Sequence, residues 1–167
     1  KGISRISFQP ITLKEKANVF TRQVEERHNR KGFIAPNRLK EPYDVESWEP
    51  AISDNDGLKT ARYGAAQAFR YAVTGSQEAR ELAKRSFDAC KWLVDITHEE
   101  GFPARVIIPA DWPEPVNEIY DHEFNIRRQQ NDPFWKDITP RFVKSENGKY
   151  LWKCDTSSDE LSGHYFF

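Results

Sequence analysis

The chain lacks several features that would point directly to a function. It contains no glycine-rich nucleotide loop, no zinc-type cysteine and histidine cluster, and no serine-hydrolase elbow. Its 25 Lys and Arg residues nearly balance its 26 Asp and Glu residues, and no basic block is present, so a nucleic-acid surface is not expected. No apolar run approaches the roughly 20 residues that a membrane helix needs. These absences leave a globular protein whose function must be argued from its motifs.

Methionine is absent and cysteine is scarce. Because Lys1 is not a translation start, we expect a processed or trimmed N-terminus, which is compatible with removal of a signal peptide. Cys90 lies on the apolar stripe of a predicted helix, and Cys154 precedes an acidic motif. Two free thiols are the favoured interpretation, and a single disulfide in an oxidising compartment is the alternative.

Apolar periodicity predicts an all-α fold in one domain of 167 residues. Thr12 and Glu15 have the spacing of a capping box at the start of the first helix. The short Thr74-Gly75-Ser76 turn makes the second and third helices an antiparallel hairpin. The helices are expected over 13–29, from about 57 to 74, from about 77 to 97, and from 157 to the end of the chain.

Prolines interrupt the two longer connections between these helices. Residues 33–53 are expected to be irregular. Residues 99–155 hold six of the ten prolines and are interpreted as an ordered, decorated loop, with a few helical turns over 117–130. Within this loop, Asn147-Gly148 separates two aromatic and β-branched runs, 142–144 and 149–152, which is typical of a β-hairpin.

Two acidic motifs stand at predicted helix starts, Asp54-Asn55-Asp56-Gly57 and the segment from Asp155 to Glu160. If the helices alternate in direction, both motifs and the Glu26–Arg30 segment lie at the same end of the molecule. Long loops at one end of a helical scaffold commonly carry functional sites. We therefore expect the working face at this end.

Three stretches carry a resemblance to a known architecture: Asp54 to Thr74, Gly101-Phe102-Pro103-Ala104-Arg105, and Asp155 to Phe167. Together with Glu26–Arg30, they resemble the (α/α) toroids of the six-hairpin glycosidase-like kind, found in many bacterial proteins that handle polysaccharides. The most similar group consists of secreted bacterial proteins without established activity. The resemblance implies antiparallel helical hairpins, a polysaccharide or oligosaccharide partner, and a secreted or periplasmic location. Since such toroids need about twice as many helices, residues 1–167 would form an incomplete part of one.

Hydrolysis of a glycosidic bond by paired carboxylates is the favoured function. One carboxylic acid protonates the leaving oxygen while a second carboxylate acts as base or nucleophile. Asp56, paired with Glu160 or Asp159, is the predicted set. The structural alternatives are a capping box between Ser157 and Glu160, and an N-cap role for Asp54 or Asp56.

A polysaccharide lyase is the second candidate. His164 or Tyr165 would remove a proton next to a uronate carboxylate, which Arg105 or Arg30 would neutralise. For Arg105, bonding to loop carbonyls is the structural alternative, and it is favoured. The third candidate is a non-catalytic module that binds glycans or serves as a scaffold. It would show aromatic rings in a groove while its acids serve as helix caps.

Further substrate contacts are predicted at Asp54, His28, Trp135 and Trp152. Tryptophan faces can stack on sugar rings, although they also pin long loops to a scaffold, and His28 is more simply a surface or loop-anchoring histidine. No cofactor is expected and no metal ligands are assigned. Calcium stays open because Asp54-Asn55-Asp56-Gly57 resembles the opening of a calcium loop, whereas the histidine and cysteine spacing does not suit zinc. The oligomeric state is left open.

Overall fold

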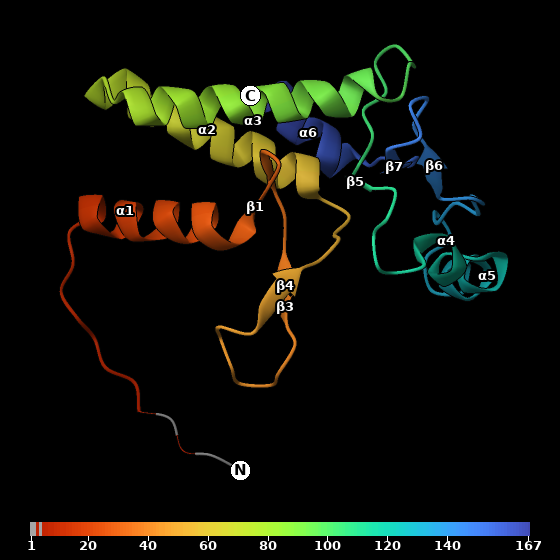
Figure 1. Cartoon of the computed structure of the whole chain (residues 1–167), viewed down its shortest axis with the longest axis horizontal. Helices are drawn as coiled ribbons and strands as arrows, with labels where there is room; N and C mark the ends of the chain where they lie inside the picture. Colours follow the sequence, from red (N-terminus) through yellow and green to blue (C-terminus); the bar gives the residue numbers. More distant parts are fainter. Residues whose placement is uncertain (1–2, 4) are drawn as a thin grey trace.

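The computed structural model describes residue 3 and residues 5–167. Figure 1 shows two long helices lying side by side, with a shorter helix behind them and small strands both beyond one end and below them. Within the described residues the elements, in chain order, are α1 (Leu13–Gln23), the π-helical turn η1 (Val24–His28), β1 (Asn29–Arg30), β2 (Phe33–Ile34), β3 (Asn37–Leu39), β4 (Trp48–Pro50), α2 (Asp56–Thr74), α3 (Gln77–Asp95), β5 (Ile107–Pro109), α4 (Val116–Ile119), α5 (His122–Gln129), β6 (Phe142–Lys144), β7 (Tyr150–Lys153) and α6 (Ser158–Phe166).

The prediction of an all-α fold is wrong, because helices are combined with three small antiparallel sheets. Strands β2, β3 and β4 lie in the connection that was expected to be irregular, whereas β1, the partner of β2, lies just before it. The third sheet has the strand order β5-β7-β6 and contains the predicted hairpin. Strands of two to four residues are too short to show the alternating pattern by which a strand is detected in sequence. These short strands form because the tertiary structure holds their partner segments beside them.

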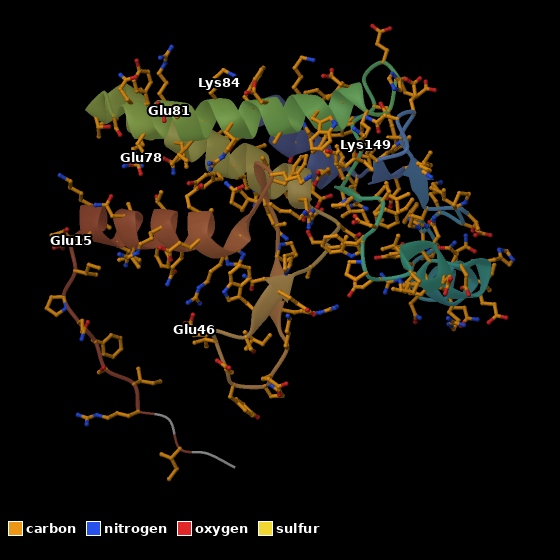
Figure 2. The ribbon with its side chains drawn as sticks, in the orientation of Figure 1. Glu15, Glu46, Glu78, Glu81, Lys84 and Lys149 are labelled. Carbon is orange, nitrogen blue, oxygen red and sulfur yellow. The ribbon has the colours of Figure 1, made fainter. Side chains whose placement is uncertain are left out.

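The α2–α3 hairpin forms as predicted, and its turn explains why. Gly75 ends α2 in the left-handed conformation, with φ of 69°, which costs glycine little. The hydroxyl of Ser76 then accepts from the amide of Ala79 and caps α3. Buried residues line both facing surfaces, and Leu93 has no exposed surface. Charged side chains such as Lys84 occupy the outer surface of α3 (Figure 2).

Helix α6 packs against α2 and runs in the same direction. A Cβ atom on Gly57 would lie 2.1 Å from Glu160 Oε1, and one on Gly64 would lie 2.4 Å from the ring of Phe167. A Cβ atom on Gly163 would lie 2.9 Å from the Cα of Leu58. These three glycines therefore permit an approach that any larger residue would obstruct. As a result, both acidic motifs lie at the same end of the helical layer.

Helix α1 begins with the predicted capping box and changes from α- to π-helical hydrogen bonding after Gln23. Thr12 and Glu15 exchange their capping hydrogen bonds. After Gln23 the helical backbone continues as the π-helix η1 to His28, and β1 begins at Asn29, so the predicted extent of the helix is confirmed to within one residue. No residue of α1 is buried, and Leu13 is 85% exposed. Its amphipathic pattern therefore does not correspond to a core face within the described residues.

Strand β5 separates two apolar clusters and connects the helices to the loop region. Ile107 faces a cluster containing Phe33 and Leu93, whereas Val106 and Ile108 face a second cluster containing Phe142. This alternation follows from the two-residue period of a strand. The predicted turns after Pro115 are present as α4 and α5. Among the described residues, no helix combines the length and apolar character needed to cross a bilayer.

Candidate functional site

Four segments that lie far apart in the sequence meet at the first turns of α2 and α6. Arg30 pairs with Asp56, Arg105 pairs with Asp155, and Glu160 lies against Gly57. These contacts join Glu26–Arg30, Asp54–Gly57, Gly101–Arg105 and the segment from Asp155 onward, which are the four stretches named from the sequence. We call this meeting point the junction. It contains two acidic groups with contrasting environments.

The first group, Asp54 and Asp155, is surrounded by basic side chains. Oδ2 of Asp155 accepts from Nη1 of Arg105 at 3.1 Å and from Nη1 of Arg141 at 2.8 Å. The ammonium of Lys153 bonds to Asp54 and lies 3.8 Å from Oδ1 of Asp155. Burial alone would raise the pKa of Asp54, but the charges of Lys153, Arg105 and Arg141 outweigh burial and lower it. Asp54 is therefore ionised at neutral pH.

This group borders a depression of about 240 Å³. The side chain of Asp54 is 44% exposed, so solvent reaches this carboxylate. One wall holds Trp135, whose ring is stacked by the guanidinium of Arg141 at 4.5 Å and whose indole N–H donates to Asn125. Of the two tryptophans predicted to contact substrate, Trp135 therefore lies at an open part of the junction.

The second group contains Asp56 and Glu160, both without exposed surface. Oδ2 of Asp56 accepts from Arg30 at 2.7 Å, and its Oδ1 accepts from the hydroxyl of Ser53 at 2.7 Å. Burial raises the pKa of Asp56, and the contacts with Arg30 and Ser53 oppose that increase. With both oxygens bonded inside the protein, Asp56 anchors the β1 segment to the start of α2.

Glu160 is enclosed without a bonded partner. Burial raises its pKa to about 7, and Asp56 adds to this increase, whereas the nearby amides of Leu58 and Gly57 and the charge of Arg105 oppose it. Neither carboxylate oxygen forms a hydrogen bond of good geometry. Nε2 of His164 lies 4.0 Å from Oε1, and burial lowers the pKa of this imidazole. Glu160 thus keeps its proton to a much higher pH than an exposed glutamate.

The two capping alternatives are wrong. The N-cap of α2 is Asn55, which makes no side-chain capping bond, and Asp56 is already inside the helix. Ser157 makes no capping bond to α6 either. Instead, its hydroxyl accepts from Arg105 at 2.6 Å and bonds to Asp159, which is exposed and has a pKa lowered chiefly by that hydroxyl. The acids of the two motifs therefore do not serve as helix caps, and their side chains can form tertiary interactions.

The remaining predicted residues are more dispersed. Trp152 packs against the apolar cluster around Leu93, and the ring of His28 bonds to the carbonyl of Ala35 at 3.0 Å, as the structural alternative expected. Tyr165 is 83% exposed. Within the described part of the chain, neither Tyr165 nor His164 forms a hydrogen bond or ion pair with Arg105.

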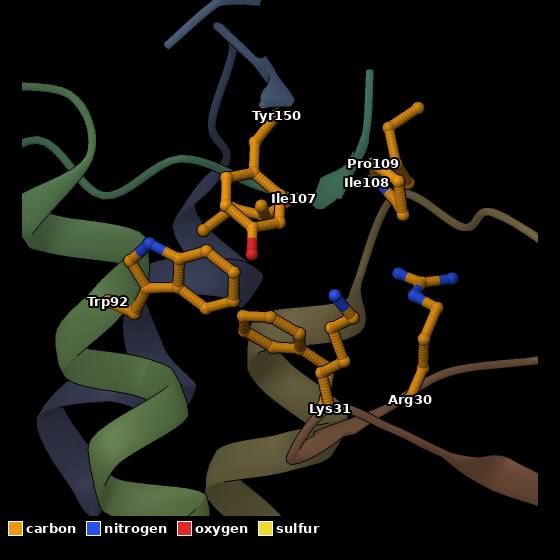
Figure 3. A pocket seen from close by; sticks show the side chains of 8 residues that line it. Arg30, Lys31, Trp92, Ile107, Ile108, Pro109 and Tyr150 are labelled. Carbon is orange, nitrogen blue, oxygen red and sulfur yellow. The ribbon is translucent and has the colours of Figure 1, made fainter. Parts of the chain in front are cut away.

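A separate small cavity lies on the other side of Arg30 (Figure 3). Trp92 and Tyr150 meet there edge to face, with ring centroids 4.9 Å apart, and the ammonium of Lys31 lies over the Tyr150 ring. Its volume of about 10 Å³ matches a single water molecule. This cavity is too small for a sugar, so the depression beside Asp54 is the better candidate.

Sequence reasoning missed two residues of the junction, Arg141 and Lys153. Both are buried, with side-chain exposures of 1% and 0%, and both bond to acids of the predicted motifs. Lys153 lies two residues before Asp155, at the end of β7. A lysine that continues a predicted strand was a usable signal in the sequence, because a lysine buried in a strand nearly always has a charged partner. Arg141 carried no such signal, because its position depends on packing against Trp135 and Asn125.

The described residues contain no group of three or more His, Cys, Asp or Glu side chains placed to hold a metal ion. The acids of Asp54–Gly57 are instead bonded to Lys153 and Arg30. Both cysteines are free thiols. Comparisons of the chain with known protein families, curated proteins and solved structures gave no match. The function is therefore inferred from the geometry of the junction.

Proposed function

We propose that the junction binds a polysaccharide or oligosaccharide and hydrolyses a glycosidic bond. The observation that supports this proposal is the presence of two carboxyl groups with opposite pKa shifts. The pKa of Glu160 is raised to about 7, whereas that of Asp54 is lowered. A pair of acids whose environments separate their pKa values is the arrangement that assigns one as general acid and the other as ionised partner.

In this proposal Glu160 is the proton donor and Asp54 is the ionised carboxylate. Glu160 transfers its proton to the glycosidic oxygen as the bond from that oxygen to the anomeric carbon breaks. Asp54 either removes a proton from the water that attacks the anomeric centre, which inverts it, or attacks that centre itself and forms a glycosyl ester. Water, deprotonated by Glu160, then displaces Asp54 from this ester, and the two displacements together retain the configuration. The assignment replaces Asp56 by Asp54, since both oxygens of Asp56 are bonded inside the protein.

A second candidate is a non-catalytic module, also similar to the (α/α) toroids, that binds glycans without cleaving them. One specific observation favours it: Glu160 has no exposed surface, so substrate would reach it only after α6 moves relative to α2. The lyase has less support. It needs His164 or Tyr165 beside an arginine, and within the described part of the chain neither residue bonds to Arg105. The similarity to (α/α) toroids and a secreted or periplasmic location are part of the same proposal.

The test is a panel of neutral and uronate-containing polysaccharides, with new reducing ends and unsaturated-uronate absorbance followed together. Hydrolysis gives reducing ends without the absorbance, and Glu160→Gln and Asp54→Asn should each lower their rate of formation by at least about 100-fold. Asp159→Asn is the matched control, since its carboxylate is exposed in the same turn of α6. Reducing ends that form at the parent rate in Glu160→Gln would contradict the proposal. Binding without either signal would favour the non-catalytic module.

A further inference from the structure

The segment before α1 carries apolar side chains that its own chain leaves uncovered. Ile6 is 81% exposed and Phe8 is 96% exposed. In an extended chain, residues two positions apart face the same side, so Ile6 and Phe8 share one face and Ser7 lies on the other. Figure 1 shows this segment leading away from α2 and α3. We call residues 5–12 the arm, and its apolar face gains stability if a partner surface covers it.

The end of the arm is restricted to extended backbone. Thr12 has φ of −71° and ψ of 155°, and it exchanges capping hydrogen bonds with Glu15. Pro10 fixes its own φ at about −65° and disfavours helical backbone at Gln9. These restrictions oppose the reversal of the chain that the arm would need to fold back onto the helix that follows it. The arm therefore reaches a neighbouring molecule more readily than its own helix.

A groove lies between the first two turns of α1 and the end of α2. It has a volume of about 610 Å³ and a mainly apolar lining, which includes Leu13, Ala17, Arg70 and Thr74. This volume falls in the roughly 300–1,000 Å³ range of pockets that enclose a ligand. The junction lies at the opposite end of α2, where the helix begins at Asp56. The groove can therefore accept side chains of a partner and is separate from the proposed catalytic groups.

Helix α1 also lacks a surface to pack against. Among the described residues none of α1 is buried, and Phe20 is 53% exposed. A helix of 11 residues is only marginally stable by itself in water, because most helices in proteins are stabilised by packing of an apolar face. The chain exposes 11421 Å², whereas a folded monomer of 19.5 kDa is expected to expose about 8,500 Å². This excess is well above the roughly 800 Å² that each partner buries in a standard interface.

From this geometry we infer that two copies of the chain form a dimer by exchanging arms, with the apolar face of each arm in the groove of the other copy. Two-fold symmetry uses the same pair of surfaces twice, so both arms and both grooves are covered. Eight extended residues span up to about 28 Å, which is long enough to cross from one α1 to the α1 of a neighbouring copy. A second copy fits this geometry because each copy carries both an apolar arm and a groove.

Sedimentation equilibrium of the full chain, from about 0.1 to 100 µM, measures the dissociation of the dimer, and we expect a Kd in the micromolar range. Phe8→Ser removes the largest arm side chain from both grooves and should raise this Kd at least about 100-fold. Since Phe8 is exposed in the single chain, its replacement should leave folding unchanged. Phe134→Ser is the matched control, because Phe134 is 87% exposed and lies between α5 and β6, and it should change the Kd less than about twofold.

The groove is tested by its own pair of variants. Ala17→Glu places a charge in the lining and should raise the Kd at least about tenfold. Ala68→Glu, exposed on α2 outside the lining, is its matched control. In a mixture of isotope-labelled and unlabelled copies, the photo-crosslinker benzoylphenylalanine at position 8 should join the arm to residues 13–18 or 70–76 of the other copy.

A monomer at every concentration would overturn the inference. A dimer whose Kd is unchanged in Phe8→Ser would overturn the arm as the occupant of the groove. Crosslinks confined to one copy would show that the arm folds back onto its own chain, and they would overturn the exchange. Crosslinks between copies, together with a weaker dimer in both Phe8→Ser and Ala17→Glu, would support it.

Discussion

Asp54 and Asp56 are two residues apart, yet the fold gives them opposite environments. The side chain of Asp54 is 44% exposed and borders the depression, whereas that of Asp56 is 1% exposed and bonded to Arg30. The difference arises because α2 begins at Asp56, which turns this side chain toward the β1 segment. The same contrast separates Asp155, beside the depression, from Glu160, inside the α2–α6 contact. Each motif thus combines a buried acid with more exposed ones: in the second motif Asp159 is exposed, and the side chain of Asp155 is 11% exposed.

This contrast shows that burial, and not residue type, decides what each acid contributes. A buried acid with a charged partner holds segments together, as Asp56 does. A buried acid without a partner keeps its proton, as Glu160 does. An accessible acid beside arginine and lysine stays ionised, as Asp54 does. Four substitutions test these assignments.

Asp56→Ala should have the largest effect on stability. It leaves the guanidinium of Arg30, 12% exposed, without its partner. Removal of one member of a buried ion pair costs about 3–5 kcal/mol. Urea unfolding at pH 7 would measure this loss. Adding Arg30→Ala to the variant should restore part of it, since the unpaired charge is then removed. A loss below about 1 kcal/mol would show that Asp56 is not an anchor.

Glu160→Gln should change the pH dependence of stability. The folded pKa of Glu160, about 7, lies above the ordinary value of 4.5. Its contribution is therefore complete below about pH 4.5 and is lost as the pH rises through about 7. At pH 8 the variant should be more stable than the parent by up to about 3 kcal/mol. Unfolding curves from pH 4 to pH 8 would show whether the two profiles diverge.

His164 provides a control for the direction of the pH effect, because its contribution to stability changes with pH in the opposite direction. Burial lowers its pKa, so its contribution is present above the ordinary value of 6.5 and is lost as the pH falls through the folded value. The Glu160→Gln variant should therefore retain a loss of stability toward acid. If the parent and the variant have identical profiles from pH 4 to pH 8, the raised pKa of Glu160 is wrong.

Gly163→Ala tests the close approach of α6 to α2 that encloses Glu160. The new methyl group would lie 2.9 Å from the Cα of Leu58, and backbone cannot move aside cheaply. Overpacking of this kind costs about 1–3 kcal/mol. Thermal unfolding is the measurement, and Ser162→Ala, exposed on the same helix, is the matched control. If Gly163→Ala is as stable as the control, the helices are farther apart than the structure shows.

Asp54→Asn should have the smallest effect on stability and a large effect on activity. The amide oxygen of the new side chain can still accept from the buried ammonium of Lys153, which also lies 3.8 Å from Asp155, so we expect a loss of about 1 kcal/mol. Hydrolysis should fall by at least about 100-fold, since the ionised carboxylate is removed. Initial rates and urea unfolding of the same preparation separate the two effects. Unchanged rates would assign catalysis elsewhere.

Local signals predicted part of this protein well. The Thr12 capping box, the Gly75 turn and the Asn147-Gly148 hairpin depend on residues close together in the sequence, and all three are present. The prediction of an all-α fold failed where strands of two to four residues pair across the loops. The substrate roles of the predicted site residues stay predictions. For Asp56 and Trp152, however, packing has already committed the side chains to internal contacts.

The sequence by itself determined the α2–α3 hairpin and the acidic motifs at two helix starts, because short-range hydrogen bonding and backbone preference act within a few residues. Only the tertiary structure decided which acids are buried, since that depends on Gly57, Gly64 and Gly163 letting α6 approach α2. It also brought Arg105, Arg141 and Lys153 around Asp155. Desolvation and charge depend on neighbours in space, and these neighbours come from segments up to 99 residues apart.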